Sequence, residues 1–314
     1  MSRTIFYAAD FHGADVVWKK FINAGRFYGA DVLIMGGDLT GKAVVPIVAG
    51  NGSFTVKGLG GEQVVSPDEV AVVEQQIRDK GLYPRRLLPE ELEALQGDND
   101  AMARVFMDAM TASLERWLDL AAERLKGTGI ELFVMLGNDD EPSLDELLSS
   151  STYGVNCEDR VVDLGEGFEM VSCGWANPTP WDSPRELPDS ELGARMEAMV
   201  RQLRDPASAV FNFHVPPYGT QLDLAPKLDS SLKPMVQGGQ FLVESVGSAE
   251  VRRLIETYQP ALGVHGHIHE ARGATRLGRT LCVNPGSVYG EGVLHGALIE
   301  LRRGQKVKYQ LTAG

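Results

Sequence analysis

Five short apolar segments of this chain each run directly into residues that can bind a metal ion. The first two are separated by residues 14–28, where Val17, Phe21 and Ala24 have helical spacing, and this order predicts the strand–helix–strand unit of a parallel sheet. Because the carboxyl ends of parallel strands meet at one edge of a sheet, we expect the residues that follow them to gather there. These residues are Asp10 with His12, Asp38, Asn138, His214, and His267 with His269.

Three of the six histidines lie in one segment, residues 263–270. His265, His267 and His269 alternate along the chain, and alternate side chains of an extended strand share a face. A His-x-His step at a strand end is a common way to hold a transition metal, although neutral histidines also fill polar niches at strand ends. The segment alone leaves both interpretations open.

The types of residue narrow the kind of metal. Aspartate, asparagine and histidine without cysteine suit borderline metals such as Mn, Fe, Zn or Ni, whereas a structural zinc site would use thiolates. Seven candidate ligands are more than one catalytic metal needs with an open position. The set therefore favours two divalent metal ions that share one carboxylate.

Charge and cysteine content exclude several classes of protein. Thirty basic against 43 acidic residues give a formal charge of −13, which argues against general nucleic-acid binding because such a surface repels phosphate backbones. The three cysteines have no C-x-x-C spacing, which predicts reduced thiols. There is no signal-peptide pattern and no apolar run near the ~20 residues that span a bilayer, so we expect a soluble, cytoplasmic protein that does not bind membranes.

The interval between Asp38 and Asn138 is longer than a crossover requires, since a helix with its loops needs about 25–35 residues. Residues 100–126 carry an apolar stripe and are predicted to form the crossover helix. Residues 42–98 are then an insertion, made of a hairpin plus helices, in an otherwise single domain over 1–314. We expect it beside the site as a lid or as a dimer contact, so a homodimer is possible.

Local signals predict several helix boundaries and loops. Ser66–Glu69 and the pair Ser143 and Glu146 resemble capping boxes, and Ser248 is expected to cap a helix that runs to about Tyr258. Residues 218–246 are expected to be a loop.

The ordered motifs D-x-H, G-D, G-N-x-D, a later H, and G-H-x-H resemble the calcineurin-like metallophosphoesterase superfamily. The match runs from residue 5 to about residue 290, apart from the insertion. The resemblance implies an α/β fold, a four-layer α/β/β/α sandwich with two mixed sheets and a dinuclear metal site at the strand ends. It also implies the metal ligands: Asp10, His12 and His269 for one ion, Asn138, His214 and His267 for the other, with Asp38 bridging.

The same resemblance implies a metal-dependent phosphoesterase, a hydrolase of phosphoric ester bonds. The favoured reaction is phosphodiester hydrolysis of a small-molecule substrate, in which a metal-bridging hydroxide attacks phosphorus in line. One alternative is a catalytically impaired metal-binding scaffold protein. A phosphomonoesterase or a nuclease of the same superfamily is another, and the acidic balance disfavours the nuclease.

One position departs from the superfamily pattern. Where G-N-H-D supplies a histidine, this chain has Asp139, which could serve as a general acid if its pKa is raised, face metal-bound water, or only hydrogen-bond its loop. Asp140 matches the final acid, which orients its neighbour. Both are candidate catalytic residues, and the missing histidine favours phosphodiesters or activated esters.

A Pro-rich loop at residues 177–186 supplies candidate substrate contacts. Asn177, Trp181 and Arg185 could stack on a base or pair with a phosphate, and the alternative is a loop that Pro residues brace for packing. His265 and His295 are assigned structural roles. The turn at residues 284–287 is expected to shape the ligand loop.

Overall fold

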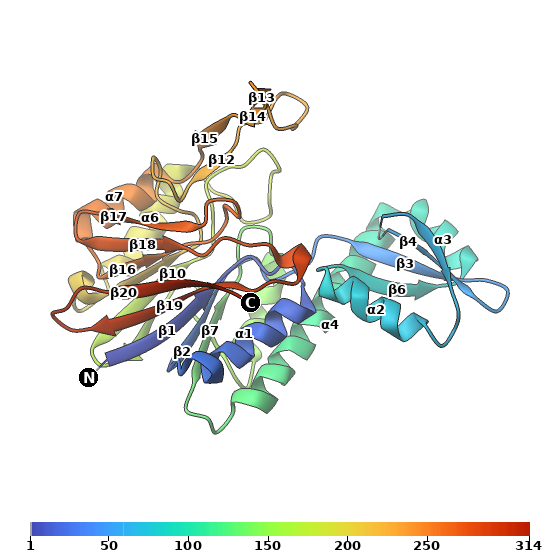
Figure 1. The fold of residues 1–314 in the computed structure, drawn as a ribbon, viewed down its shortest axis with the longest axis horizontal. Helices are drawn as coiled ribbons and strands as arrows, with labels where there is room; N and C mark the ends of the chain where they lie inside the picture. The colour runs from blue at the N-terminus through green and yellow to red at the C-terminus, as the bar shows by residue number, and fades with distance from the viewer. Residues whose placement is uncertain (1, 59) are drawn as a thin grey trace.

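Two six-stranded mixed sheets form the centre of the molecule in the computed structural model, which describes residues 2–58 and 60–314 (Figure 1). In each sheet four neighbouring strands are parallel and the remaining strands are antiparallel. The first sheet has the order β20-β19-β1-β2-β7-β8: β1 (Ser2–Ala8), β2 (Val32–Gly36), β7 (Glu131–Met135), β8 (Val155–Asn156), β19 (His295–Arg302) and β20 (Lys308–Ala313). The second has the order β17-β18-β16-β11-β10-β9: β9 (Val161–Gly165), β10 (Phe168–Cys173), β11 (Val210–Phe213), β16 (Leu262–Val264), β17 (Gly273–Leu277) and β18 (Thr280–Asn284).

Each sheet is apolar on both faces. One face packs against the other sheet, and the opposite face packs against helices. In β1, Ile5 and Tyr7 belong to the core between the sheets, whereas Phe6 and Ala8 belong to the core beneath the helices. This is the two-residue alternation of a strand that is buried on both faces.

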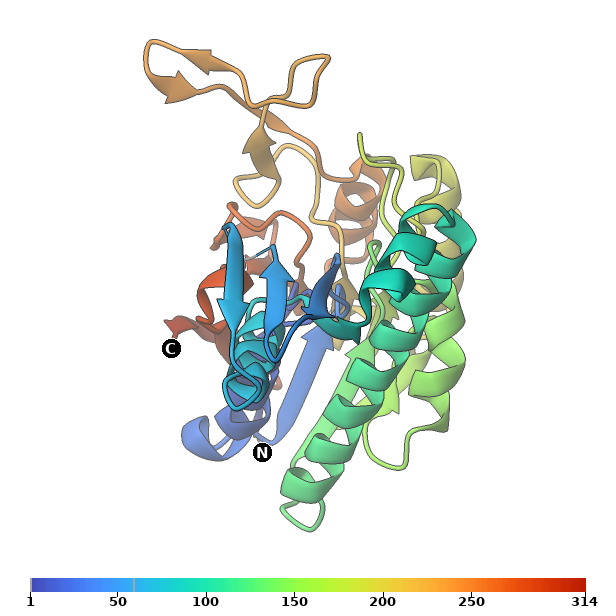
Figure 2. The same cartoon turned by 90° about the vertical axis from the view of Figure 1, so that its right-hand side faces the viewer.

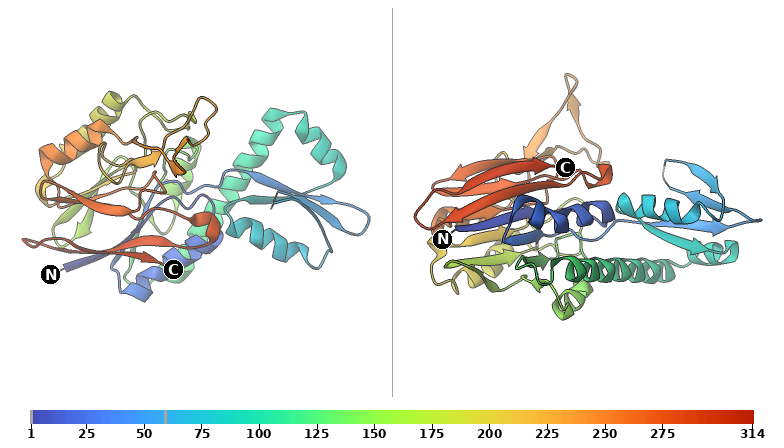
Figure 3. Two further views of the ribbon diagram at one scale, coloured as in Figure 1. Left: turned by 45° about the horizontal axis from the view of Figure 1, so that its top comes forward. Right: turned by 60° about the horizontal axis from the view of Figure 1, so that its bottom comes forward.

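Helices cover the outer face of each sheet and complete four layers, α/β/β/α (Figure 3). On the first sheet lie α1 (Asp15–Tyr28) and α4 (Asn99–Leu125), joined by the stacked rings of Trp18 and Trp117, whose centroids are 4.9 Å apart. The turn η1 (Pro142–Leu144) and α5 (Asp145–Ser150) follow β7. On the second sheet lie α6 (Asp189–Val200) and α7 (Ala249–Tyr258). The predicted four-layer α/β sandwich is confirmed.

A smaller sheet with helices projects from the body within the segment that the sequence marked as an insertion (Figures 1 and 2). It has the order β5-β4-β3-β6 and a core of its own, with Ile47, Val56 and Ile77 fully buried. The sequence predicted a hairpin and two helices here, and the structure adds β5 and β6. The elements are β3 (Val44–Ala49), β4 (Phe54–Lys57), β5 (Glu62–Val65), α2 (Val70–Asp79), β6 (Tyr83–Leu87) and α3 (Pro89–Gln96).

Three glycines join this smaller sheet to the body. A Cβ on Gly41 would overlap the carbonyl oxygen of Gly81, and a Cβ on Gly81 would overlap that of His12. Gly13 completes the contact, since a Cβ there would lie 2.8 Å from Gly41. The backbone of the insertion therefore touches the loop that carries His12.

Residues 218–246, predicted as a loop, form an arm of two short hairpins that projects from the body (Figure 2). The strands are two or three residues long and pair with each other, so no extended alternation marks them in the sequence. They are β12 (Leu224–Pro226), β13 (Val236–Gln237), β14 (Gln240–Phe241) and β15 (Val243–Ser245).

The predicted helix caps have different outcomes. Ser248 caps α7, because its Oγ accepts a hydrogen bond from the backbone N–H of Val251 at 3.0 Å. The box at Ser143 is wrong, since the chain forms η1 there and the Ser143 hydroxyl meets the Met107 sulfur instead. The turns η2 (Pro206–Ser208) and η3 (Tyr289–Glu291) complete the elements. Among the helices of the described ranges, none is long and apolar enough to cross a bilayer.

Candidate metal centre

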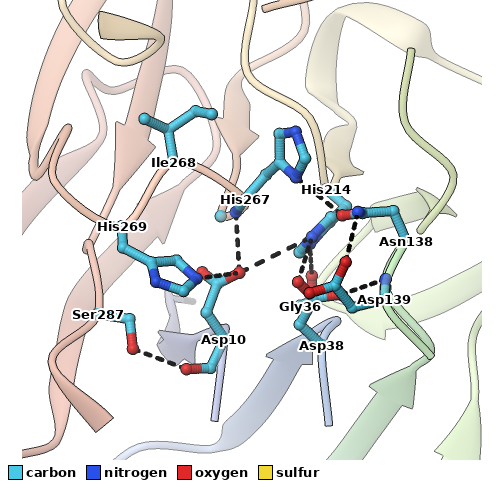
Figure 4. Close-up of polar contacts among 12 residues, drawn as sticks. Asp10, Gly36, Asp38, Asn138, Asp139, His214, His267, Ile268, His269 and Ser287 are labelled. Atoms are coloured by element: carbon cyan, nitrogen blue, oxygen red, sulfur yellow. Dashed lines mark hydrogen bonds and ion pairs between the residues drawn. The ribbon is translucent and has the colours of Figure 1, made fainter. Parts of the chain in front are cut away.

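Polar residues that follow five strands meet at one edge of the stacked sheets (Figure 4). Asp10 and His12 follow β1 and Asp38 follows β2, while His269 comes from the loop after β16. One ligand atom from each of these four residues lies within 4.8 Å of the others. Asn138 after β7, His214 after β11 and His267 after β16 flank this group.

The first part of the cluster is formed by Asp10, His12 and His269, and two of its buried atoms lack hydrogen-bond partners. His12 Nε2 lies 3.1 Å from His269 Nε2, and His269 Nε2 lies 3.7 Å from Asp10 Oδ1. Within the described residues, the buried atoms Asp10 Oδ2 and His12 Nδ1 have no hydrogen-bond partner. Because buried polar atoms are nearly always paired, this arrangement fits a bound cation.

The second part of the cluster is formed by Asn138, His214 and His267. Hydrogen bonds hold its rings in the orientation that a metal ligand needs. His214 Nδ1 lies 2.8 Å from the Gly36 carbonyl oxygen, which accepts but cannot donate, so the ring proton is on Nδ1. Nε2 then faces Asp38, with Oδ2 3.4 Å away. His267 Nδ1 and Asn138 Oδ1 are 2.8 Å apart. A backbone contact that fixes the tautomer is typical of a metal-binding histidine.

Asp38 lies between the two parts. Its Oδ2 is 3.6 Å from His12 Nε2 and 3.4 Å from His214 Nε2. Its Oδ1 accepts a hydrogen bond from the backbone N–H of Asp139 at 3.0 Å. This position is the one that a shared carboxylate would occupy.

The electrostatics of the cluster differ between its histidine rings. Burial disfavours the charged form of His214, but Asp38 and Asp10 outweigh burial and raise the pKa of His214 to about 10. Burial lowers the pKa of His267 to about 3, so this ring keeps its lone pair at neutral pH. Buried carboxylates that hold positive charge on one ring, beside a second ring that stays neutral, form a set of donors that fits divalent metal ions.

The backbone is strained at four of the candidate ligands. Asp10, His12, Asp38 and His267 have φ values of 61°, 42°, 56° and 67°. Side chains other than glycine rarely adopt this left-handed region, and such strain is concentrated at functional sites. Next to them, a Cβ on Gly137 would overlap Asp38 Oδ1, so this position requires glycine.

Asp140 connects the two loops that carry Asp38 and Asn138. Its buried carboxylate accepts hydrogen bonds from the backbone N–H groups of Leu39, Thr40 and Gly137 at 2.7–3.0 Å. It therefore ties the loop after β2 to the loop after β7. This geometry suits the orienting role that the sequence suggested for Asp140.

The carboxylate of Asp139 contacts Lys42, a residue that the sequence gave no reason to select. Its Oδ2 pairs with the ammonium of Lys42 at 2.8 Å, and its Oδ1 accepts hydrogen bonds from Ser183 Oγ at 2.7 Å and Asn138 Nδ2 at 3.0 Å. Lys42 lies between β2 and β3, far from Asp139 in the sequence. A lone lysine after a Thr-Gly pair has no motif that would have identified it.

The Pro-rich loop at residues 177–186 places Arg185 differently from the expected substrate contact. Arg185 is 3% exposed, pairs with Glu158 at 2.8 Å, and donates to the Gly137 carbonyl oxygen at 3.0 Å. We therefore assign Arg185 a structural role beneath the Asn138 loop. Asn177 donates to the Val246 carbonyl oxygen at 3.2 Å, and Trp181 is 65% exposed.

The turn after β18 braces the histidine loop. Asn284 Nδ2 donates to the carbonyl oxygens of Gly266 and Ile268 at 3.2 and 3.0 Å, and Ser287 Oγ donates to that of Asp10 at 2.7 Å. These contacts agree with the expected role of this turn. The ring of His265 is buried, with Nδ1 2.8 Å from the Phe213 carbonyl oxygen.

Known proteins share this fold. No protein-family model matches the chain. The chain is 28% identical over 158 residues to the uncharacterized protein MJ1162 of Methanocaldococcus jannaschii, a match that covers 50% of this chain and 64% of that relative, which is less than two thirds of its length. The crystal structure of TT1561 from Thermus thermophilus covers 99% of both chains with 16% identity and a TM-score of 0.52, and a further crystal structure does so with 18% identity and a TM-score of 0.55.

These two alignments establish the fold alone. A dimetal phosphatase from Danio rerio also aligns over 98% of both chains, with 9% identity and a TM-score of 0.43, which is below the level that indicates a shared fold. The four-layer sandwich and the ligand motifs at its strand ends are those that the calcineurin-like metallophosphoesterase superfamily implies. The resemblance is confirmed at the level of the fold.

Proposed function

We propose that this chain is a dinuclear-metal-dependent phosphoester hydrolase that acts on a small-molecule phosphodiester. The observation that carries the proposal is the cluster of Asp10, His12, Asp38 and His269, in which one ligand atom of each lies within 4.8 Å of the others. Two buried atoms of the cluster, Asp10 Oδ2 and His12 Nδ1, have no hydrogen-bond partner among the described residues. Asp10, His12 and His269 are the proposed ligands of one ion. Asn138, His214 and His267 are those of the other, and Asp38 belongs to both.

Two divalent ions bound there would supply Lewis acidity, which polarises phosphoryl oxygens and makes water more acidic. The contribution of the chain is to hold the donor atoms in place before any ion arrives. The backbone N–H of His267 donates to Asp10 Oδ1 at 2.9 Å, and the N–H of Asp139 donates to Asp38 Oδ1 at 3.0 Å. Each carboxylate is therefore fixed by one oxygen and presents the other.

Charge favours a diester over a monoester. A phosphodiester carries one negative charge, whereas a phosphomonoester carries up to two at neutral pH. The superfamily histidine would add positive charge beside the metals, but this chain has Asp139 there, and the pair that Asp139 forms with Lys42 adds no net charge. A singly charged substrate matches this balance better. Hydrolysis of monoesters or nucleic acids by the same centre is the alternative.

The test uses purified full-length protein with Mn²⁺ and bis(4-nitrophenyl) phosphate, with bound metal measured by elemental analysis. We expect hydrolysis by the wild type, and loss of both bound metal and activity in Asp38→Ala. Asp108→Ala, a matched change at an exposed position of α4, should retain both. Absence of bound ion together with absence of hydrolysis under every divalent metal would overturn the proposal. Bound metal without hydrolysis of any diester would favour a scaffold.

A further inference from the structure

An ammonium group lies at the solvent side of the candidate metal centre. The side chain of Lys42 is 52% exposed, and that of its partner Asp139 is 26% exposed. Lys42 Nζ lies 2.8 Å from Asp139 Oδ2, and the N–H of Asp139 donates to Asp38, the proposed shared ligand. The ammonium is therefore separated from that ligand by one residue while remaining open to solvent.

Asp139 connects this ammonium to the candidate ligands. Its carboxylate accepts hydrogen bonds from three side chains, those of Lys42, Ser183 and Asn138, at 2.7–3.0 Å. Its own N–H donates to Asp38 at 3.0 Å. In this arrangement the carboxylate acts as an acceptor, and the geometry gives it a positioning role in place of the general-acid role considered from the sequence.

The backbone around Lys42 is also fixed. The N–H of the preceding residue, Gly41, donates to the Tyr83 hydroxyl at 2.7 Å, and Gly41 belongs to the three-glycine contact with Gly81 and Gly13. Lys42 is followed by β3, which pairs with β6. The insertion therefore sets where the lysine leaves the body of the protein.

Nζ retains donor capacity for a ligand. An ammonium has three hydrogens to donate, and within the described residues Nζ uses one of them for Asp139. Burial lowers the pKa of Lys42, but the hydrogen bond and the charge of Asp139 outweigh burial and raise it above its ordinary value. The group therefore remains a cation at neutral pH and is suited to stabilise negative charge.

We propose that Lys42 is the substrate-binding cation of this site, whose ammonium donates to a non-bridging oxygen of the phosphodiester, and that Asp139 is its positioning residue. This inference rests on the proposed phosphodiesterase function. Charge-assisted hydrogen bonds between an ammonium and a phosphoryl oxygen are among the stronger polar contacts in proteins. At the sequence position of the superfamily histidine this chain thus has Asp139, which holds a donor whose charge is already balanced.

The Lys42–Asp139 pair contributes little to the stability of the fold by itself, because exposed ion pairs are screened by solvent. Replacing Lys42 should therefore leave folding and metal content unchanged, and an effect on substrate can be measured separately.

The experiment compares Lys42→Met, Lys42→Arg, Asp139→Asn and the double variant Lys42→Met/Asp139→Asn as metal-loaded full-length proteins. Loss of a charged hydrogen bond predicts a decrease of about 10- to 100-fold in kcat/KM for bis(4-nitrophenyl) phosphate in Lys42→Met. Lys42→Arg should recover most of the loss. If Asp139 acts through Lys42, the double variant should be no slower than Lys42→Met. Lys126→Met, at an exposed position after α4, is the matched control.

A second measurement does not depend on turnover. Calorimetric titration with inorganic phosphate should show a weaker Kd in Lys42→Met by a similar factor, with metal content by elemental analysis equal to that of the wild type. Unchanged kinetics and unchanged phosphate affinity in Lys42→Met, with an active wild type, would refute the role of Lys42 and leave the phosphodiesterase intact. Loss of metal in Lys42→Met would also refute it. A wild type without metal or hydrolysis would refute the proposed function itself.

Discussion

The buried ion pair between Arg185 and Glu158 supports the loop that carries Asn138, and its loss has an expected magnitude. Arg185 is 3% and Glu158 is 6% exposed, with Nη2 and Oε1 2.8 Å apart. Arg185→Met keeps an apolar stem but leaves the carboxyl buried without its cation. Breaking a buried pair in this way costs about 3–5 kcal/mol of unfolding free energy, a large part of the total of about 5–15 kcal/mol for a domain.

The unfolding free energy that Arg185→Met loses should depend on pH. Burial raises the pKa of Glu158 from 4.5 to about 7 even though Arg185 lowers it. The folded state therefore binds the Glu158 proton more tightly than the unfolded state does. The stability that this proton contributes is present below about pH 4.5 and is lost as the pH rises through about 7. Without Arg185 the folded carboxyl stays protonated to higher pH. The deficit of the variant relative to the wild type should therefore grow from pH 6 to pH 8, by at most about 1.4 kcal/mol per pH unit.

Urea unfolding at pH 6 and pH 8, followed by circular dichroism, measures both quantities. Arg195→Met is the matched control, because Arg195 pairs with Asp159 at the surface and its guanidinium lies 4.9 Å from the ring of Trp175, against 5.1 Å for Arg185. The control should lose less than about 1 kcal/mol at either pH. Equal losses in the two variants, or a deficit that shrinks toward pH 8, would refute the reasoning.

Two further substitutions test the local geometry. Gly137→Ala should abolish metal binding as measured by elemental analysis, because the added Cβ overlaps Asp38 Oδ1. In the control Gly97→Ala the added Cβ has space, and this variant should bind metal normally. Normal metal binding by Gly137→Ala would contradict the close approach of Gly137 to Asp38. Ser248→Ala removes the cap of α7 and should lower the unfolding free energy by about 1 kcal/mol with hydrolysis unchanged, and an unchanged denaturation midpoint would show that the cap contributes nothing.

The sequence predicts the strand-end residues well because their signal is local. Each is preceded by a few apolar residues that form a buried strand, as Leu262–Val264 precede His267. The sandwich itself followed from the resemblance that those motifs carry. β6 was missed because its sequence, YPRRL, contains a proline and two arginines, which are unfavourable inside a sheet. In the structure β6 is an edge strand of the insertion sheet, where a proline is tolerated.

Contacts between distant segments account for most of the remaining differences. Arg185 in a Pro-rich loop has the same local signal whether it faces a substrate or a buried carboxylate, and only the fold brings Glu158 beneath it. Lys42 is similar, since its pairing with Asp139 depends on how the insertion joins the body. The box expected at Ser143 failed because Pro142 begins a 3₁₀ turn before the helix.

The left-handed backbone at Asp10, His12, Asp38 and His267 sets local stability against the presence of these candidate ligands. Glycine adopts positive φ without the steric cost that a Cβ brings, so a chain optimised only for stability would carry glycine at these four positions. Each candidate ligand therefore stands against a local conformational preference. Substitution of any of them by glycine would relax the backbone and remove a candidate metal ligand in the same step.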